Sequence, residues 1–188
     1  MNAYVRTTGN GYQIMCIQGA RILGGSWRNF SGEARTYDSG GKHHFAIEIE
    51  ERFVQLLKDF GFNVGFYQRD DNPGFYHLDI TVSWSLRDPD VNVVAYNGVK
   101  THQSEATIGD LDRNTNIDFA DMELTAYHWT MPGGRSGVKP YAEHVYIYLG
   151  QPSSSEQRYQ ERFQTPVQPE LPNMPEAVLA GDEYDIPF

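Results

Sequence analysis

Before residue 150, the apolar residues of this chain recur mostly with a period of two, and only one segment has the spacing of an amphipathic helix. A period of two is typical of strands that bury one face. It predicts strands over residues 12–23, 26–37, 42–50, 62–68, 75–84, 91–96, 117–130 and 137–149. The pattern therefore favours a mainly β fold with a single helix.

The helix is predicted over residues 50–60, with acidic residues in its first turn and Gly61 as its stop signal. Its apolar positions i, i+3, i+4 and i+7 are Phe53, Leu56, Leu57 and Phe60. Three strands, a helix and then further strands is the element order of an OB-fold, a small Greek-key barrel that often binds oligonucleotides. The additional strands would elaborate this barrel, and a β-sandwich fits the number of strands nearly as well.

The composition of the chain changes near Gly150. Beyond it, few large apolar residues remain and the prolines are Pro152, Pro166, Pro169, Pro172, Pro175 and Pro187. Such a segment cannot bury enough surface to offset the entropy lost on ordering. We therefore predict a folded domain over residues 1–150 and a disordered acidic tail over residues 151–188.

The sequence closes on Asp185, Ile186, Pro187 and Phe188. The carboxylates could contact basic residues of a partner while Ile186 and Phe188 fill an apolar pocket, and Pro187 prevents a regular helix or inner strand. Bacterial and phage single-stranded DNA-binding proteins resemble this chain in their last residues. The resemblance implies that these four residues bind replication or repair proteins, and a frayed, solvated end is the alternative.

The net charge of −10, taken whole, argues against binding to nucleic acid, but the charge is unevenly distributed. Residues 1–45 carry five Lys and Arg against two acidic residues, whereas residues 163–188 carry five acidic residues and no Lys or Arg. Because charges are screened over about 8–10 Å, a local basic patch matters more than the total.

Aromatic and cationic residues alternate along residues 27–45, as a groove for single-stranded nucleic acid requires. This segment resembles a family of phage single-stranded DNA-binding proteins, and the matching positions are Asn29, Phe30, Gly32, Tyr37, Gly40 and Phe45. The helix with the glycine after it, and residues 136–141, resemble the same family. The resemblance covers roughly residues 20–149 and implies a protein that coats single strands and recruits partners through its tail.

Candidate DNA-binding residues follow from this segment and from the last two strands. They are Trp27, Arg28, Phe30, Arg35, Tyr37, Lys42, His44, Tyr127, Trp129, Arg135 and Lys139. Tyr127 and Trp129 are expected to point outward, because Leu124 and its alternate neighbours occupy the apolar face. Phe30 could equally belong to the core, where Phe45 and Trp84 are expected.

Signals for metal binding or catalysis are weak. Cys16 alternates with Ile14 and reads as a small buried hydrophobe, and a single cysteine allows no internal disulfide, which suits a reducing cytoplasm. His43 and His44 would point to opposite faces of a strand. Residues 110–121 resemble the start of a calcium loop, but Thr115 stands where the sharp turn needs glycine. We expect no enzyme activity, no cofactor and no metal site.

The leading hypothesis is a non-enzymatic protein that coats and protects single-stranded DNA in replication, recombination or repair and recruits partners through its acidic tip. A β-sandwich that binds protein or glycan is the alternative. A nuclease is the third possibility, with the carboxylates Asp110, Asp112, Asp118 and Asp121. The sequence has no transmembrane-length apolar run and no secretory signal, so we expect a cytoplasmic location, which is the host-cell cytoplasm if the protein is phage-encoded. The oligomeric state stays open.

Overall fold

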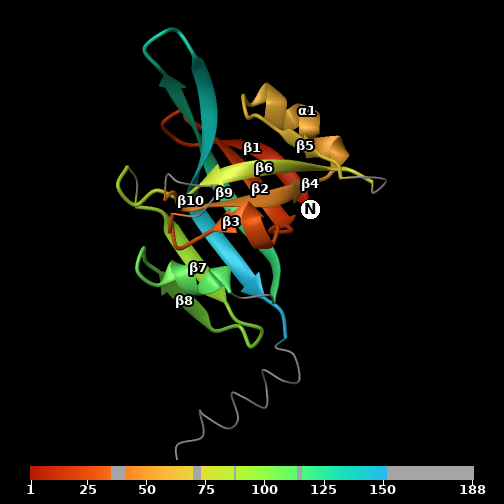
Figure 1. Ribbon diagram of the computed structural model, residues 1–188, viewed down its shortest axis with the longest axis vertical. Helices are drawn as coiled ribbons and strands as arrows, with labels where there is room; N and C mark the ends of the chain where they lie inside the picture. Colours follow the sequence, from red (N-terminus) through yellow and green to blue (C-terminus); the bar gives the residue numbers. More distant parts are fainter. Residues whose placement is uncertain (35–40, 70–72, 87, 114–115, 152–188) are drawn as a thin grey trace, which may run out of the picture. The chain divides into compact units, whose positions relative to one another are not determined.

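The computed structural model describes residues 1–34, 41–69, 73–86, 88–113 and 116–151, and these ranges contain ten strands and one α-helix (Figure 1). The elements are β1 (Asn2–Thr7), β2 (Gln13–Ala20), η1 (Gly25–Trp27), β3 (Arg28–Asn29), β4 (His44–Ile49), α1 (Glu51–Asp59), β5 (Gly65–Tyr67), β6 (Phe75–Thr81), β7 (Asp90–Val94), β8 (Lys100–Gln103), η2 (Ile108–Asp112), β9 (Ile117–Thr130) and β10 (Ser136–Leu149). The predicted fold class is confirmed. In the described ranges no helix is long and apolar enough to cross a membrane.

Five strand segments close into a ring. β9 pairs antiparallel with β2 on one side and with β10 on the other, and β4 pairs antiparallel with β6. β10 meets β6 in parallel where Tyr141 lies opposite Thr81. The ring closes just after β2, where Ile22 pairs with Ile47 and the Leu23 N–H donates to the carbonyl of residue 46 at 2.9 Å. This closed five-stranded barrel is the predicted OB-fold and not the β-sandwich alternative.

The remaining strands extend this ring. β1 pairs with β2, β3 with β4 and β5 with β6, while β7 runs parallel to the second half of β10 and carries β8 on its other side. In Figure 1 the β9–β10 hairpin extends away from the barrel at one end, and β7 and β8 lie toward the other. β1 and β8 were absent from the predicted strands because neither has a buried apolar row: β8 is entirely polar, and β1 buries only Ala3.

The barrel encloses the hydrophobic core. Inward positions alternate along each ring strand, and those that are buried are Met15, Ile17, Phe45, Ile47, Leu78, Ile80, Met122, Leu124, Val145 and Ile147. α1 adds Val54 and Leu57 to the same core, and the chain leaves the helix through Gly61, whose φ of +98° suits glycine. Phe45 and the thiol-bearing Cys16 are buried, as the sequence predicted.

The prediction of a long strand over residues 26–37 was wrong. Only Arg28–Asn29 pairs with β4; η1 precedes this pair, and the chain then turns at Gly32, whose φ is +66°. α1 therefore follows the second strand of the ring and not the third. The local alternation was misleading because the Arg28 side chain and the Phe30 backbone N–H are held by Asp112 of η2, about 80 residues further along the chain.

Phe30 tests this account of the core. Its side chain is 0 % exposed and its ring centroid lies 5.3 Å from that of Phe45. We expect Phe30→Ala to lower the free energy of unfolding by about 3–5 kcal/mol, the usual cost of removing a buried phenyl ring. Urea denaturation measures it, with Phe66→Ala as the control because Phe66 is 55 % exposed. Equal losses in the two variants would contradict the assignment of Phe30 to the core.

Candidate nucleic-acid interface

The β9–β10 hairpin carries a row of aromatic side chains on the outer surface of the barrel. Leu124 is fully buried inside, and side chains alternate along a strand, so Tyr127 and Trp129 lie on the outer face. Across the hairpin they pair directly with Lys139 and Gly137. The structure thus shows the outward direction that the sequence predicted for both aromatics, and places a cation beside them.

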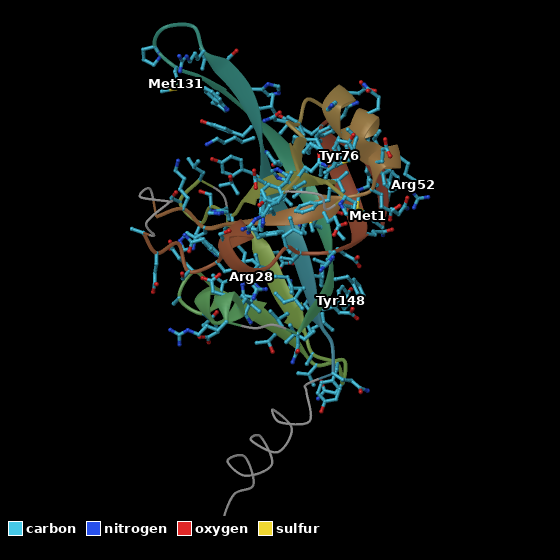
Figure 2. The ribbon with its side chains drawn as sticks, turned by 45° about the vertical axis from the view of Figure 1, so that its right-hand side comes forward. Met1, Arg28, Arg52, Tyr76, Met131 and Tyr148 are labelled. Atoms are coloured by element: carbon cyan, nitrogen blue, oxygen red, sulfur yellow. The ribbon has the colours of Figure 1, made fainter. Side chains whose placement is uncertain are left out.

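Within this row Tyr127 is 41 % exposed and Trp129 is half-buried. The Tyr127 ring meets the Tyr141 ring edge to face, with 5.2 Å between centroids. Burial raises the pKa of the Tyr141 hydroxyl, with Tyr127 adding to the effect, so Tyr141 stays uncharged at neutral pH. Arg135 is exposed near the hairpin tip, where Figure 2 shows Met131 far from the barrel.

The same outer face continues from the hairpin across the barrel. Tyr141 of β10 lies opposite Thr81 of β6, and Thr81 lies opposite His44 of β4. Residues directly opposite each other point to the same side of a sheet, so all three share the outer face. His44 is half-buried and its Nδ1–H donates to the carbonyl of Lys42 at 3.0 Å, while the Lys42 side chain is exposed.

Further along β6, four rings form an aromatic cluster, which consists of Trp27, Tyr67, Phe75 and His77. The Trp27 ring lies 4.7 Å from His77 and 5.2 Å from Tyr67, and Tyr67 lies 5.5 Å from Phe75. Sequence reasoning found only Trp27. The alternation along residues 75–84 was a usable signal, because it places Phe75 and His77 on the face opposite Leu78.

Two predicted DNA contacts are instead part of the fold. Phe30 is fully buried, so its ring offers no face to a base. Arg28 is 7 % exposed, and its Nη2 donates to the carbonyl of Asp112 at 3.2 Å. We therefore correct both predictions and leave these residues out of the candidate surface.

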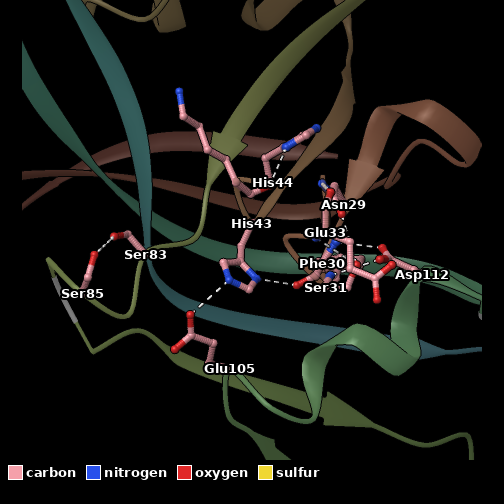
Figure 3. A network of polar contacts seen from close by, with 11 residues as sticks. Asn29, Phe30, Ser31, Glu33, His43, His44, Ser83, Ser85, Glu105 and Asp112 are labelled. Carbon is pink, nitrogen blue, oxygen red and sulfur yellow. Dashed lines mark hydrogen bonds and ion pairs between the residues drawn. The ribbon is translucent and has the colours of Figure 1, made fainter. Parts of the chain in front are cut away.

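Asp112 holds the turn that these residues begin. Its Oδ1 accepts the N–H of Phe30 at 2.7 Å and its Oδ2 accepts the N–H of Ser31 at 3.0 Å (Figure 3). Hydrogen bonds to an ionised acceptor are the stronger kind. The Asn29–Gly32 motif, read in the sequence as a mark of DNA binding, is thus a structural turn fixed to η2.

His43 fixes the same turn from its other side. Its Nδ1–H donates to the carbonyl of Phe30 at 2.7 Å, and its Nε2 lies 3.2 Å from a carboxylate oxygen of Glu105 (Figure 3). A Cβ at Gly32 would come within 2.7 Å of the His43 ring, so glycine allows this close approach as well as the positive φ. Trp84, predicted in the core, packs at the core's edge with its ring 5.1 Å from His43.

The charges of the outer face are unevenly placed. Cations gather near the hairpin, at Lys139 and Arg135, whereas Asp79 is exposed on β6 and Glu48 of β4 pairs with Arg21 at 3.1 Å. Phosphates would therefore meet their most favourable potential along the hairpin.

The carboxylates of the nuclease alternative do not gather. In the part of the chain that the structure describes, no three His, Cys, Asp or Glu side chains converge on a possible metal position. Asp112 uses both carboxylate oxygens on backbone amides, and Asp121 accepts the N–H of Gly19 at 2.8 Å. The remaining predicted site residues, Arg35, Tyr37, Asp185, Ile186, Pro187 and Phe188, lie outside the described residues.

A five-stranded OB barrel with aromatic and cationic side chains on one face is typical of proteins that bind single-stranded nucleic acid. Comparison with known families agrees: the model of the putative phage ssDNA-binding domain matches residues 7–173. The chain belongs to this family, which confirms the resemblance seen in its sequence motifs. No curated protein matches it.

Weak similarity to solved structures includes two phage proteins. A single-stranded DNA-binding protein from bacteriophage Enc34, in complex with ssDNA, is 10 % identical with a TM-score of 0.47, over 74 % of this chain and 88 % of that chain. The single-stranded DNA-binding protein gp2.5 of bacteriophage T7 is 12 % identical with a TM-score of 0.34, over 76 % of this chain and 96 % of that chain. At such low similarity, the assignment rests on the family model.

The contacts of Asp112 predict a large effect from one substitution. Asp112→Ala removes two charge-assisted hydrogen bonds, so we expect the free energy of unfolding to fall by about 3 kcal/mol. The amides of Phe30 and Ser31 should exchange faster with solvent deuterium. Asp110→Ala removes the same charge from η2 and serves as the control. Similar unfolding curves and amide exchange in the two variants would show that Asp112 does not hold the turn.

Proposed function

We propose that this protein binds single-stranded DNA on the outer face of its barrel, with the β9–β10 hairpin as the main contact, and that it coats and protects the strand. The observation that supports this best is the shared outer face of Tyr127, Trp129 and Lys139 in a chain of this family. Stacking on an aromatic ring contributes about 1–3 kcal/mol per base and does not read base edges. Binding is therefore tolerant of sequence.

Cations along the hairpin supply the electrostatic part of the binding. Lys139 lies in the aromatic row and Arg135 near the tip, and each can neutralise a phosphate and release counterions. The net charge of −10 does not prevent this, because at physiological salt a phosphate on the hairpin interacts mainly with charges within about 8 Å. Lys42 extends the proposed surface beside His44, and Arg35 and Tyr37 stay candidate contacts from the sequence alone.

The aromatic cluster provides a second stacking surface. Tyr67 is 39 % exposed and Phe75 is half-buried, so both rings can contact a base without leaving their partners. Asp79, exposed with 66 % of its side chain accessible, lies between this cluster and Thr81 on β6. We infer that a bound strand turns its bases rather than its phosphates toward this part of the barrel.

We further propose a non-enzymatic role in replication, recombination or repair in the host-cell cytoplasm, with partners recruited through the end of the chain. Asp185 would contact basic residues of a replication or repair protein, while Ile186 and Phe188 enter an apolar pocket and Pro187 limits the conformations of the segment. In this proposal the domain of residues 1–150 binds DNA, and the acidic tail of residues 151–188 competes with DNA for the basic surface when no partner is present.

Two substitutions separate stacking from charge neutralisation. Trp129→Ala should weaken binding to oligo-dT by about 1–3 kcal/mol and leave the salt dependence unchanged, because stacking releases no counterions. Lys139→Ala should weaken binding and reduce the slope of log K against log salt by about 0.7. Fluorescence anisotropy of a labelled oligonucleotide at several salt concentrations measures both effects.

Lys100→Ala is the matched control for this pair. Lys100 is aligned with the far end of β10, roughly 30 Å along the strand from Lys139, and its Nζ contacts the Tyr146 hydroxyl. Its removal changes the net charge as much as that of Lys139 but should leave the salt slope unaltered. Unchanged affinity in folded Trp129→Ala and Lys139→Ala proteins would contradict the proposed surface.

The tail gives a separate prediction. Removing residues 151–188 changes the net charge from −10 to −5, so DNA binding should tighten, chiefly at low salt where screening is weak. Phe188→Ala keeps every charge, so it should abolish capture of host replication or repair proteins and leave DNA affinity almost unchanged. Pull-down and anisotropy measure the two effects. Full capture by the Phe188→Ala protein, or unfolding of the truncated one, would contradict this role of the tail.

A further inference from the structure

Gly137 lies directly opposite Trp129 in the β9–β10 hairpin. A Cβ at this position would come within 2.7 Å of Cζ2, 2.9 Å of Cε2 and 3.0 Å of Nε1 of the indole, and the two shorter distances are closer than Cβ atoms approach other atoms in proteins. The backbone of Gly137 does not have a positive φ, so its conformation is open to any residue. The missing side chain is therefore required by the indole and not by the backbone.

Other glycines in the same hairpin behave differently. Gly133 and Gly134 have φ values of +106° and +82°, and a Cβ at either position would have no atom within 4 Å, so the turn alone accounts for them. The arrangement at Gly137 does recur in the aromatic cluster: Gly65 lies opposite His77, and a Cβ at Gly65 would collide with the His77 ring. At both aromatic sites of the outer face, a ring thus rests against a glycine of the neighbouring strand.

We propose that Gly137 is a positioning residue for DNA binding. Because it has no side chain, the Trp129 indole can pack against the backbone at position 137, which holds the indole in the orientation that stacks on a base. This inference rests on the function proposed above. A ring fixed before binding loses less conformational freedom when the base arrives, which strengthens binding without any new contact to DNA. A methyl group at position 137 displaces the indole from this packed position, although position 137 itself touches no base.

The test is a double-mutant cycle in the full-length protein. It compares Gly137→Ala, Trp129→Ala and the double variant, with oligo-dT affinity read by anisotropy. Trp129→Ala should weaken binding about 5- to 150-fold, the equivalent of one lost stacking contact. Gly137→Ala should weaken binding at least about threefold with an unchanged salt slope, and should have no further effect once Trp129 is absent.

Gly9→Ala is the control, because Gly9 lies in the turn between β1 and β2 with ordinary φ and no atom within 4 Å of a Cβ. It should leave affinity unchanged. A second readout follows the indole itself: in protein that contains 5-fluorotryptophan, the ¹⁹F resonance of Trp129 should shift in free Gly137→Ala protein and not in Gly9→Ala. The resonance is assigned by its loss in Trp129→Phe.

The outcomes separate this inference from the function on which it rests. If Trp129→Ala leaves affinity unchanged, the proposed DNA-binding surface is wrong. If Trp129→Ala weakens binding but Gly137→Ala does not, or if the two effects simply add, the proposed DNA-binding surface is supported and the positioning role of Gly137 is refuted. An unshifted ¹⁹F resonance of Trp129 in Gly137→Ala also refutes the positioning role of Gly137. A shift of Trp129 together with a non-additive loss of affinity supports it.

Discussion

Closure of the barrel is the constraint on which the rest of the structure depends. The backbone pairing of Ile22 with Ile47, and the short parallel contact of Tyr141 with Thr81, join the ring strands into one surface. Once the ring is closed, each alternate side chain belongs either to the core or to the outside. The aromatic side chains of the hairpin are then on the same face as β6 and β4, although these strands lie far apart in sequence.

A second constraint links the loops to this barrel. Asp112 in η2 and His43 at the start of β4 both bind the turn at residues 29–32, so a segment that could have wrapped DNA is part of the framework. The surface that we propose for DNA carries few cations. On that proposal, binding would depend more on stacking than on phosphate contacts, in keeping with the net charge of −10.

The sequence was sufficient for features that depend on local periodicity. The helix followed from its helical spacing of apolar residues, and the strands β9 and β10 and the outward direction of Tyr127 followed from alternation, because one face of each element packs on the core. Features that depend on distant contacts were not accessible: Arg28 and Phe30 resembled groove residues because their partner Asp112 is about 80 residues away. In the aromatic cluster, alternation could have placed Phe75 and His77 on the outer face, but the contact of Trp27 with Tyr67 forms only after the barrel closes.

In the complex that we propose, single-stranded DNA lies on the outer face of the barrel against the hairpin. Photocrosslinking of the full-length protein to oligonucleotides that contain 5-iodouracil, followed by mass spectrometry, tests it most directly, because crosslinks form where a base touches an aromatic ring. We expect crosslinks at Trp129 and Tyr127, with additional ones at Tyr67 or Phe75 on longer strands. Crosslinks confined to Tyr96 or Tyr146, in the region of β7 and β8, would contradict it.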